Sequence, residues 1–203
     1  MLITLGLFLD GEHGWRPAKR LGMPVLGPLG LLNLLETQLG LLRADCPHAQ
    51  RVTQYRECLK HCDTPDRFYH ASFGIDPIGT SASLLSWRDV WHLHGWNGAL
   101  PAGAGVRVTD VATVETAARG LLFPSIGERL VRVAELLSRQ QSSIESVELV
   151  DPMEAFPKRW REGTDRNFSR TTRSGRVAKG GAGRACRAST AHPVCGSGAC
   201  KRR

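Results

Sequence analysis

The sequence predicts an α/β fold in which helices predominate around a short central sheet, followed by a separate basic segment. Three observations point to this class. An apolar run opens the chain, several later stretches repeat apolar residues every three or four positions, and the charge balance changes near residue 158. With 203 residues, of which 41% are hydrophobic, the chain is long enough to bury a core. Its composition excludes a collagen-like, coiled-coil or wholly disordered protein.

The first two strands are predicted near the amino terminus. Met1–Leu9 is apolar and ends at a turn signal, Asp10-Gly11, so we expect it to form the central strand. This run is shorter than the roughly 20 residues of a membrane span, and no basic residues precede it. We therefore expect no membrane segment, no signal peptide and a cytoplasmic protein. Pro24–Leu26 predicts a second short strand, and Gly27–Gly30 a tight turn.

Helical spacing recurs through the rest of the body. It predicts helices over residues 28–42, 48–62, 77–94, 109–122 and 125–140. Two of these helices begin with a capping signal. Asp76-Pro77 offers an N-cap carboxylate and a proline in the first turn, and Ser125 with Glu128 forms a capping box.

Aromatic residues and alternation predict the remaining elements. Asp66–Phe73 is typical of a short aromatic turn or helix, and Glu145–Val150 alternates like a strand. Trp87 and Trp91 lie on the helix predicted over 77–94, and we expect both to pack in the core.

The last part of the chain differs in charge and pattern. Residues 1–157 hold 14 Lys and Arg against 17 Asp and Glu, whereas residues 158–203 hold 13 against two. Apolar periodicity ends near the same place, so we divide the chain into a folded body, 1–160, and a disordered basic tail, 161–203. We therefore expect deletion of residues 163–203 to leave the stability of the body nearly unchanged.

The tail is also the candidate nucleic-acid interface, because clustered cations attract phosphate groups whatever the base sequence. The residues predicted to contact nucleic acid are Arg166, Arg170, Arg173, Arg176, Lys179, Arg184 and Arg187. Beyond Trp160 the only aromatic residue is Phe168, which leaves little for base stacking. We therefore expect this binding to be nonspecific and sensitive to salt.

A glycine-containing turn stands where a phosphate-binding loop would join a strand to a helix. A working G-x-x-x-x-G-K-[ST] loop needs a Lys to reach the terminal phosphates and a hydroxyl to bind magnesium. Leu31 and Leu32 follow the glycines here, and Pro28 removes one N–H donor. Gly27, Pro28 and Gly30 therefore form a degenerate loop, and we predict no nucleotide or other cofactor.

The carboxylates of a nuclease site are missing as well. A PD-(D/E)xK nuclease holds magnesium with an Asp and with a second carboxylate two positions before a Lys. Pro65-Asp66 supplies the first part, but Phe156 stands two positions before Lys158, where the second carboxylate is needed. The sequence therefore predicts no catalytic residue and no enzyme activity.

Several His and Cys residues offer potential metal ligands. His92 and His94 are two positions apart on a predicted helix, so they do not share a face, and a helix-end His commonly lies near the last carbonyl groups. The tail holds Cys186, His192, Cys195 and Cys200. Their spacing lacks the paired C-x₂-C of common zinc sites, so we predict no metal centre. Cys62 falls on the apolar stripe of its predicted helix, where we expect a buried thiol.

Five stretches of the body carry a family resemblance. They are, in order, MLITLGLFLDG, VLGPLGLLNLLETQLGL, RFYHASFGIDPIGTSASLLSWRDVWHLHGW, GERLVRVAELL and DPMEAFPKRW. Together they resemble the amino-terminal region of large AddB-like proteins. These belong to the PD-(D/E)xK nuclease family and are related to the helicase–exonuclease subunits of bacterial double-strand-break repair. The resemblance covers about residues 1–160 and is most specific over 27–40 and 67–96.

The resemblance implies a helicase-like, Rossmann-like α/β domain with a degenerate nucleotide motif. It also implies DNA and a helicase partner subunit as partners of the intact relative, in which the nuclease lies hundreds of residues later. The tail composition is that of GC-rich coding sequence read out of frame. We therefore interpret the chain as a truncated gene product, with genuine family sequence to about Glu162 and frameshifted translation after it.

Three functional interpretations follow from these observations. The first is a non-catalytic amino-terminal fragment of a DNA-repair and recombination protein of this family. The second is a stand-alone nucleic-acid-binding protein that acts through its Arg-rich tail. The third is a small Cys/His metal-binding protein. For this chain taken alone, we expect nonspecific binding to nucleic acid at most.

Overall fold

The computed structural model of the chain describes residues 1–10, 23–42, 46–167 and 169–172. It is an α/β structure in which helices predominate, as predicted. The strands are β1 (Leu2–Leu5), β2 (Val25–Leu26), β3 (Ser146–Leu149) and β4 (Ser169–Thr172). The helices are α1 (Pro28–Gln38), α2 (His48–Cys62), α3 (His70–Ile75), α4 (Pro77–Leu93), α5 (Val106–Ala118), α6 (Ile126–Leu137), the short 3₁₀ helix η1 (Met153–Ala155) and α7 (Lys158–Asn167). Within the described ranges, none of these helices has the length and apolarity needed to cross a membrane.

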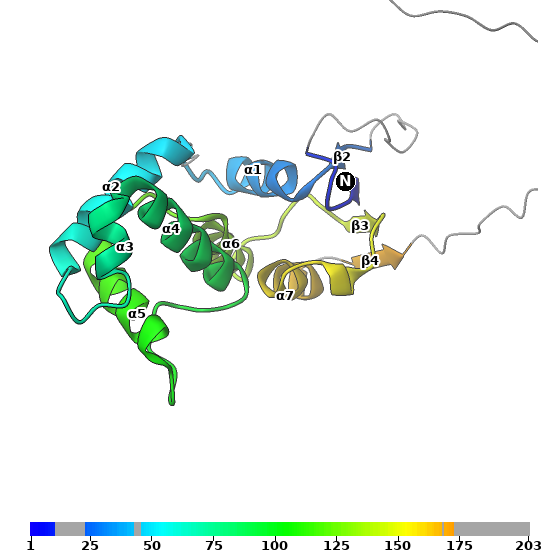
Figure 1. Cartoon of the computed structure of the whole chain (residues 1–203). Helices are drawn as coiled ribbons and strands as arrows, with labels where there is room; N and C mark the ends of the chain where they lie inside the picture. Colours follow the sequence, from blue (N-terminus) through cyan, green and yellow to red (C-terminus); the bar gives the residue numbers. More distant parts are fainter. Residues whose placement is uncertain (11–22, 43–45, 168, 173–203) are drawn as a thin grey trace, which may run out of the picture. The chain divides into compact units, whose positions relative to one another are not determined.

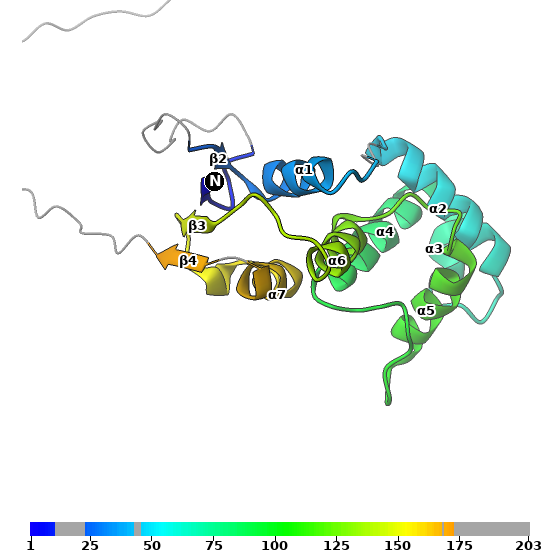
Figure 2. The same cartoon turned by 180° about the vertical axis from the view of Figure 1, so that it is seen from behind.

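The four strands form one parallel sheet in the order β2-β1-β3-β4 (Figures 1 and 2). Leu5 of β1 lies opposite Leu26 of β2 on one side and opposite Leu149 of β3 on the other. β1 is therefore an inner strand, which confirms the predicted central position. It is shorter than the predicted Met1–Leu9, because the chain turns after Gly6.

A first hydrophobic core packs the sheet against α1, α6 and α7. Its buried members are Ile3, Leu5, Leu31, Leu32, Leu35, Leu130, Val133, Ile144, Val147, Leu149, Met153, Phe156 and Trp160. The leucines of α1 and the Leu130–Val133 face of α6 repeat at helical spacing, so each helix buries one stripe. This core therefore fixes the position of β1 and β3 relative to α1, α6 and α7.

A second hydrophobic core lies within the helices α2 to α5. Its buried members are Val52, Tyr55, Cys58, Leu59, Tyr69, Phe73, Leu84, Leu85, Val114 and Ala118. Figure 1 shows α2, α3, α4 and α5 gathered together in the long connection between β1 and β3. Because α4 also packs against α6, the second core is joined to the first.

The predicted capping signals act as expected. The Asp76 side chain accepts a hydrogen bond from the N–H of Gly79 at the start of α4, and Ser125 with Glu128 forms a reciprocal capping box at the start of α6. Several ends differ from the prediction by three or four residues: α5 begins at Val106 instead of residue 109, and α6 ends at Leu137 instead of residue 140. Helix α1 stops at Gln38, just before Gly40 adopts a positive φ of 66°, and α5 ends at Ala118 instead of residue 122.

The structure differs from the predicted body and tail between residues 161 and 172. Helix α7 continues to Asn167, and β4 then pairs with β3 in parallel. Trp160 and Thr164, one helical turn apart, are both buried, and they fix α7 against the first core. Two such side chains are too few to give an apolar periodicity, which explains why the sequence does not reveal the helix. The predicted disorder of residues 173–203 falls outside the described residues.

Trp87 is not a core residue, contrary to the prediction. Its side chain is 40% exposed, although it lies on the helix α4, whose neighbouring Leu84 and Leu85 are buried. Trp91 is partly buried and contacts Trp96 edge to face. Helical spacing distinguishes faces of α4 only coarsely, and Trp87 falls at the border of the buried face.

Two truncations test the revised boundary. A chain ending at residue 162 loses the buried Thr164 and strand β4, so we expect its thermal unfolding midpoint to fall by at least about 4 °C. A chain ending at residue 173 keeps both, and we expect its midpoint to match that of the full chain. Scanning calorimetry compares the two, and equal midpoints for all three chains would return the boundary to residue 160.

Candidate functional site

The carboxyl ends of the strands form the first candidate site. In parallel α/β sheets, ligands bind outside these ends at the point where the strand order reverses, which here lies between β1 and β3. Gly6 follows β1, and Asp151 follows β3. The backbone N–H of Leu7 donates to Asp151 Oδ2 at 2.7 Å, and a Cβ at Gly6 would lie 3.2 Å from the same oxygen. A carboxylate of the chain therefore bridges the two loops at the reversal point.

A second carboxylate occupies the amino terminus of α1. Asp10 Oδ2 accepts a hydrogen bond from the N–H of Leu29 at 2.6 Å, and Asp10 Oδ1 accepts one from the N–H of Gly30 at 2.7 Å. These N–H groups are among the donors that a helix leaves unpaired at its start. A Cβ at Gly27 would collide with the Asp10 carboxylate and backbone nitrogen. Gly27 thus makes room for Asp10.

The predicted degenerate loop is therefore placed as expected but is filled from within the chain. Strand β2 does lead into helix α1 at this point, but only Gly27 lies between them: Pro28 and Gly30 are already in the first turn of α1, so the tight turn predicted over Gly27–Gly30 is helical instead. A phosphate group would need the N–H donors that Asp10 holds, and it would meet a negative charge there. In the sequence Asp10 looks like part of a turn, so this contact was not predicted. An acidic residue directly after the first strand is the signal that could have revealed it.

Replacing Asp10 by alanine tests this contact. The change removes two charge-assisted hydrogen bonds at the start of α1, so we expect the free energy of unfolding to fall by about 1–2 kcal/mol. Asp66→Ala is the matched control, because Asp66 is exposed in the turn after α2, and we expect a change within about 0.5 kcal/mol. Urea unfolding measures both. Equal stability of the two variants would show that Asp10 does not cap α1.

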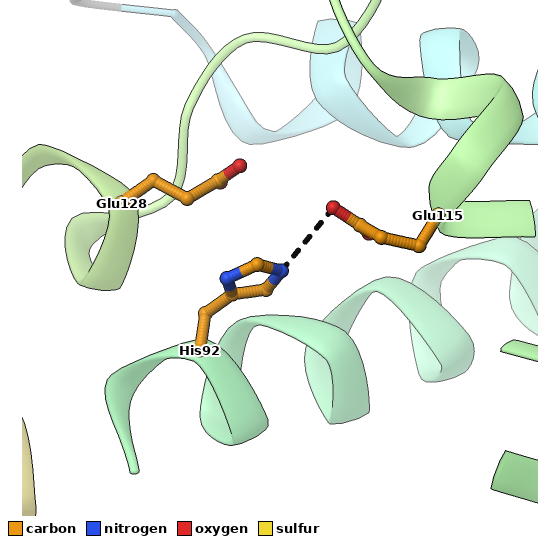
Figure 3. A group of neighbouring side chains, drawn as sticks. All are labelled: His92, Glu115 and Glu128. Carbon is orange, nitrogen blue, oxygen red and sulfur yellow. Dashed lines mark ion pairs between the residues drawn. The ribbon is translucent and has the colours of Figure 1, made fainter. Parts of the chain in front are cut away.

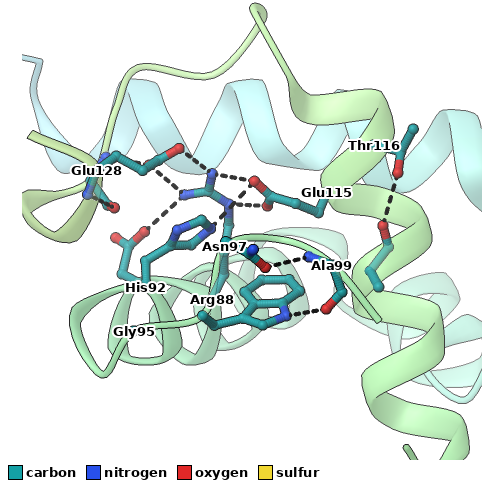
Figure 4. Close-up of polar contacts among 12 residues, drawn as sticks. Arg88, His92, Gly95, Asn97, Ala99, Glu115, Thr116 and Glu128 are labelled. Atoms are coloured by element: carbon teal, nitrogen blue, oxygen red, sulfur yellow. Dashed lines mark hydrogen bonds and ion pairs between the residues drawn. The ribbon is translucent and has the colours of Figure 1, made fainter. Parts of the chain in front are cut away.

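The second candidate site is a buried polar group where α4, α5 and α6 meet. Arg88 of α4 is 2% exposed, and its Nη2 atom donates to Glu115 of α5 and to Glu128 of α6, each at 2.8 Å. Figure 4 shows the guanidinium between the two carboxylates. The rigid fork of Arg donors matches two carboxylates at once. Arg88 therefore joins three helices that are distant in sequence.

These groups stabilise one another's charged forms. Burial acts to raise the pKa of Glu128, but hydrogen bonds and charge from Arg88, together with Ser125, lower it to about 2. Burial likewise acts to raise the pKa of Glu115, and the close contact with His92 and the hydrogen bonds from Arg88 outweigh it and lower that pKa. For Arg88, burial acts to lower the pKa, and the bonds to both glutamates raise it. All three groups are therefore charged at neutral pH.

His92, Glu115 and Glu128 bring three potential metal-ligand atoms within 4.8 Å of one another (Figure 3). His92 Nε2 lies 3.3 Å from Glu115 Oε1. However, the guanidinium of Arg88 already supplies the positive charge between the two carboxylates. A metal ion would have to displace this buried and paired arginine, which is energetically costly. The donor set therefore fits an ion-pair network that fixes three helices, and it does not fit a metal centre.

His92, in α4, and His94, directly after α4, do not share a face, as predicted. His92 is 6% exposed, whereas His94 lies at the surface. The expected contact of His92 with helix-end carbonyl groups is replaced by the contact with Glu115, on a different helix. Sequence spacing gives the face of a histidine but not its partner across a helix interface.

Three further arginine–carboxylate pairs join distant segments. They are Arg51 with Asp89, Arg67 with Asp110, and Arg129 with Glu36. The pair of Arg129 and Glu36 is almost fully buried and joins α6 to α1 through two hydrogen bonds. Such pairs lie between 38 and 93 residues apart in sequence, so no local pattern predicts them.

The thiols of α2 are placed differently from the prediction. Cys58, not Cys62, lies on the buried face with Tyr55 and Leu59, and Cys62 is only partly buried. Burial raises the pKa of both thiols. Neither is therefore an activated nucleophile at neutral pH.

The predicted nucleic-acid and tail residues lie mostly beyond the described part of the chain. Arg166 is in α7, and Arg170 is in β4, opposite Val147 of β3. The others, Arg173, Arg176, Lys179, Arg184 and Arg187, fall outside the described residues, as do the potential metal ligands Cys186, His192, Cys195 and Cys200. The two positions examined for nuclease chemistry lie in different elements. Asp66 is in the turn after α2, and Lys158 begins α7.

Comparison with known proteins adds no assignment to these sites. The chain matches no protein-family model. It also has no significant match among curated proteins.

Proposed function

We propose that the chain is the amino-terminal, helicase-like region of an AddB-like protein of the PD-(D/E)xK nuclease family, with a non-catalytic role in DNA repair and recombination in the cytoplasm. The observation that carries the proposal is the parallel sheet whose expected phosphate position, at the start of α1, holds Asp10. This arrangement is what a Rossmann-like domain with a lost nucleotide site would have.

The same geometry supports a binding role over catalysis. Asp10 competes with any phosphate for the N–H groups of Leu29 and Gly30, and no Lys follows the loop to hold the terminal phosphates. Arg88 neutralises Glu115 and Glu128, which leaves them unsuited to act as a base. Partners of the proposed region are DNA and a helicase subunit.

Activity measurements test the non-catalytic role. We expect the purified chain neither to hydrolyse ATP nor to degrade linear duplex DNA with magnesium, because both catalytic residue sets are missing. A fluorescent ATP analogue should likewise show no saturable binding. Magnesium-dependent nuclease activity that is lost in Asp66→Ala, or saturable nucleotide binding, would overturn this part of the proposal.

The charge distribution favours a second candidate function, nonspecific binding of nucleic acid through the basic terminal segment. Residues 174–203 hold seven Lys and Arg and no Asp or Glu, whereas residues 1–173 hold 20 against 19. If this segment neutralises phosphates, log Kd for duplex DNA rises with log salt by about 0.9 per phosphate contact. A titration at two salt concentrations, with the full chain and a chain ending at residue 173, measures how much of the DNA affinity this segment supplies. Equal affinity and slope for the two chains would exclude the segment as the binding element.

Reading the DNA beyond codon 203 in all three frames tests the family assignment independently. Helicase-like and nuclease sequence in a shifted frame supports the AddB-like assignment. An unrelated gene after a stop codon favours the stand-alone nucleic-acid-binding protein.

A further inference from the structure

An open cleft of about 410 Å³ lies between α3 and the first part of α4, and none of the residues of the two candidate sites lines it. It is lined by Phe68, Tyr69, Ser72, Asp76, Gly79, Thr80, Ser83, Leu84 and Trp87. Three aromatic side chains thus border a space that is also lined by the hydroxyl groups of two serines and a threonine. The cleft has the size and the mixed lining of a small-ligand site.

The rings of Phe68 and Trp87 are within 8° of parallel, with centroids 6.5 Å apart. A planar group that stacks on one ring is therefore also aligned with the other. The side chain of Trp87 is 40% exposed. The exposed ring area is available to a flat, aromatic partner.

Buried structure holds the ring of Phe68 and the backbone of α4 at Trp87. The backbone N–H of Phe68 donates to the buried Asp110 at 2.9 Å, and the ring of Phe68 meets that of the buried Tyr69 edge to face. Trp87 precedes Arg88, whose guanidinium is fixed between two carboxylates. The stacking surface is therefore positioned before any ligand arrives, which lowers the entropic cost of binding.

A cation stands over the ring of Phe68. The guanidinium of Arg107, an exposed residue of α5, lies 5.9 Å from the centroid of the Phe68 ring. The one carboxylate lining the cleft, Asp76, already accepts the N–H of Gly79. A ligand with a flat ring and a negative charge would thus find a stacking face, hydroxyl donors and a cation together.

We propose that this aromatic cleft binds a base of single-stranded DNA, which stacks on Trp87 while Arg107 attracts the adjacent phosphate. A base in a duplex shows only its edges, so the cleft selects unpaired strands. The inference rests on the proposed function in one respect, that DNA is a partner. It adds which form of DNA is bound and by which residues.

The test compares bases with bare phosphates. The full chain is titrated, at about 0.2 M salt to weaken phosphate contacts, with a fluorescent oligothymidylate of about 12 nucleotides and with an abasic strand of equal length. We expect the oligothymidylate to bind more tightly. Trp87→Ala should weaken its binding about fivefold or more and leave the abasic strand unaffected, whereas Trp87→Phe should stay within about twofold of the natural protein.

Val90→Ala is the matched control, because Val90 is also exposed on α4 but does not line the cleft. Unfolding midpoints of all variants establish that they fold. The proposal is overturned if Trp87→Ala binds oligothymidylate as the natural protein does, if it weakens both strands equally, or if the abasic strand binds as tightly as oligothymidylate. Each of these results leaves DNA as a partner through another surface. Absence of binding to both strands and to duplex DNA would instead remove DNA from the proposed function.

Discussion

Replacing Arg88 by methionine is expected to lower the free energy of unfolding by about 3–5 kcal/mol. Methionine keeps much of the side-chain volume but leaves the buried Glu115 and the partly buried Glu128 without their shared cation. Urea unfolding followed by circular dichroism measures the loss. Arg56→Met is the matched control, since the partly exposed Arg56 pairs with the exposed, adjacent Glu57, and we expect a cost below about 1 kcal/mol.

The same variant should change the acid sensitivity of the protein. Because the folded state lowers the pKa of Glu128 from 4.5 to about 2, the unfolded state binds protons first as the pH falls. The stability that this group contributes is therefore complete above about pH 4.5 and is lost between about pH 4.5 and 2. In Arg88→Met this part of the pH dependence should disappear. An unchanged stability slope in that window would contradict the assigned role of Arg88.

Replacing Gly127 by alanine is expected to cost about 1–3 kcal/mol, although alanine is the better helix former. Gly127 is buried in the first turn of α6, and a Cβ there would lie 2.6 Å from the carbonyl carbon of His92 and 2.7 Å from the nitrogen of Leu93. Both are backbone atoms of α4, so they cannot move aside as a flexible side chain would. Thermal unfolding measures the effect.

Gly74→Ala is the control for helix propensity. Gly74 is also helical, in α3, but it is exposed, and nothing lies within 4 Å of a Cβ built on it. We therefore expect this variant to gain about 0.5–1 kcal/mol. If both variants were stabilised, α4 and α6 would not approach as closely as described.

The elements with strong local signals were predictable. The capping box at Ser125 and Glu128 and the N-cap at Asp76 mark the starts of α6 and α4 correctly, because capping involves residues three positions apart. The inner position of β1 also follows from its unbroken apolar run. Such features depend on neighbours in sequence, and local reasoning reaches them.

The features decided by distant contacts were not predictable. Helix α7 depends on Trp160 packing into a core built from other segments, and the surrounding charge hides it. The carboxylate of Asp10 reaches α1 across 19 residues, and Arg88 reaches Glu128 across 40. Any arginine has several carboxylates as potential partners in sequence. Only the packing of helices selects among them.

The pairing of β1 with β3 has a consequence for how the chain is synthesised. Leu5 and Leu149 are neighbours in the sheet, so β1 must wait for some 140 residues before this partner leaves the ribosome. At typical elongation rates of 5–20 residues per second, the delay is about 7 to 30 seconds. During that time the apolar segment at the start of the chain has an open edge, which is a hazard for association with other nascent chains. The helices α2 to α5, whose contacts are mostly local, are free to fold in the interval and shorten the loop that β3 must close.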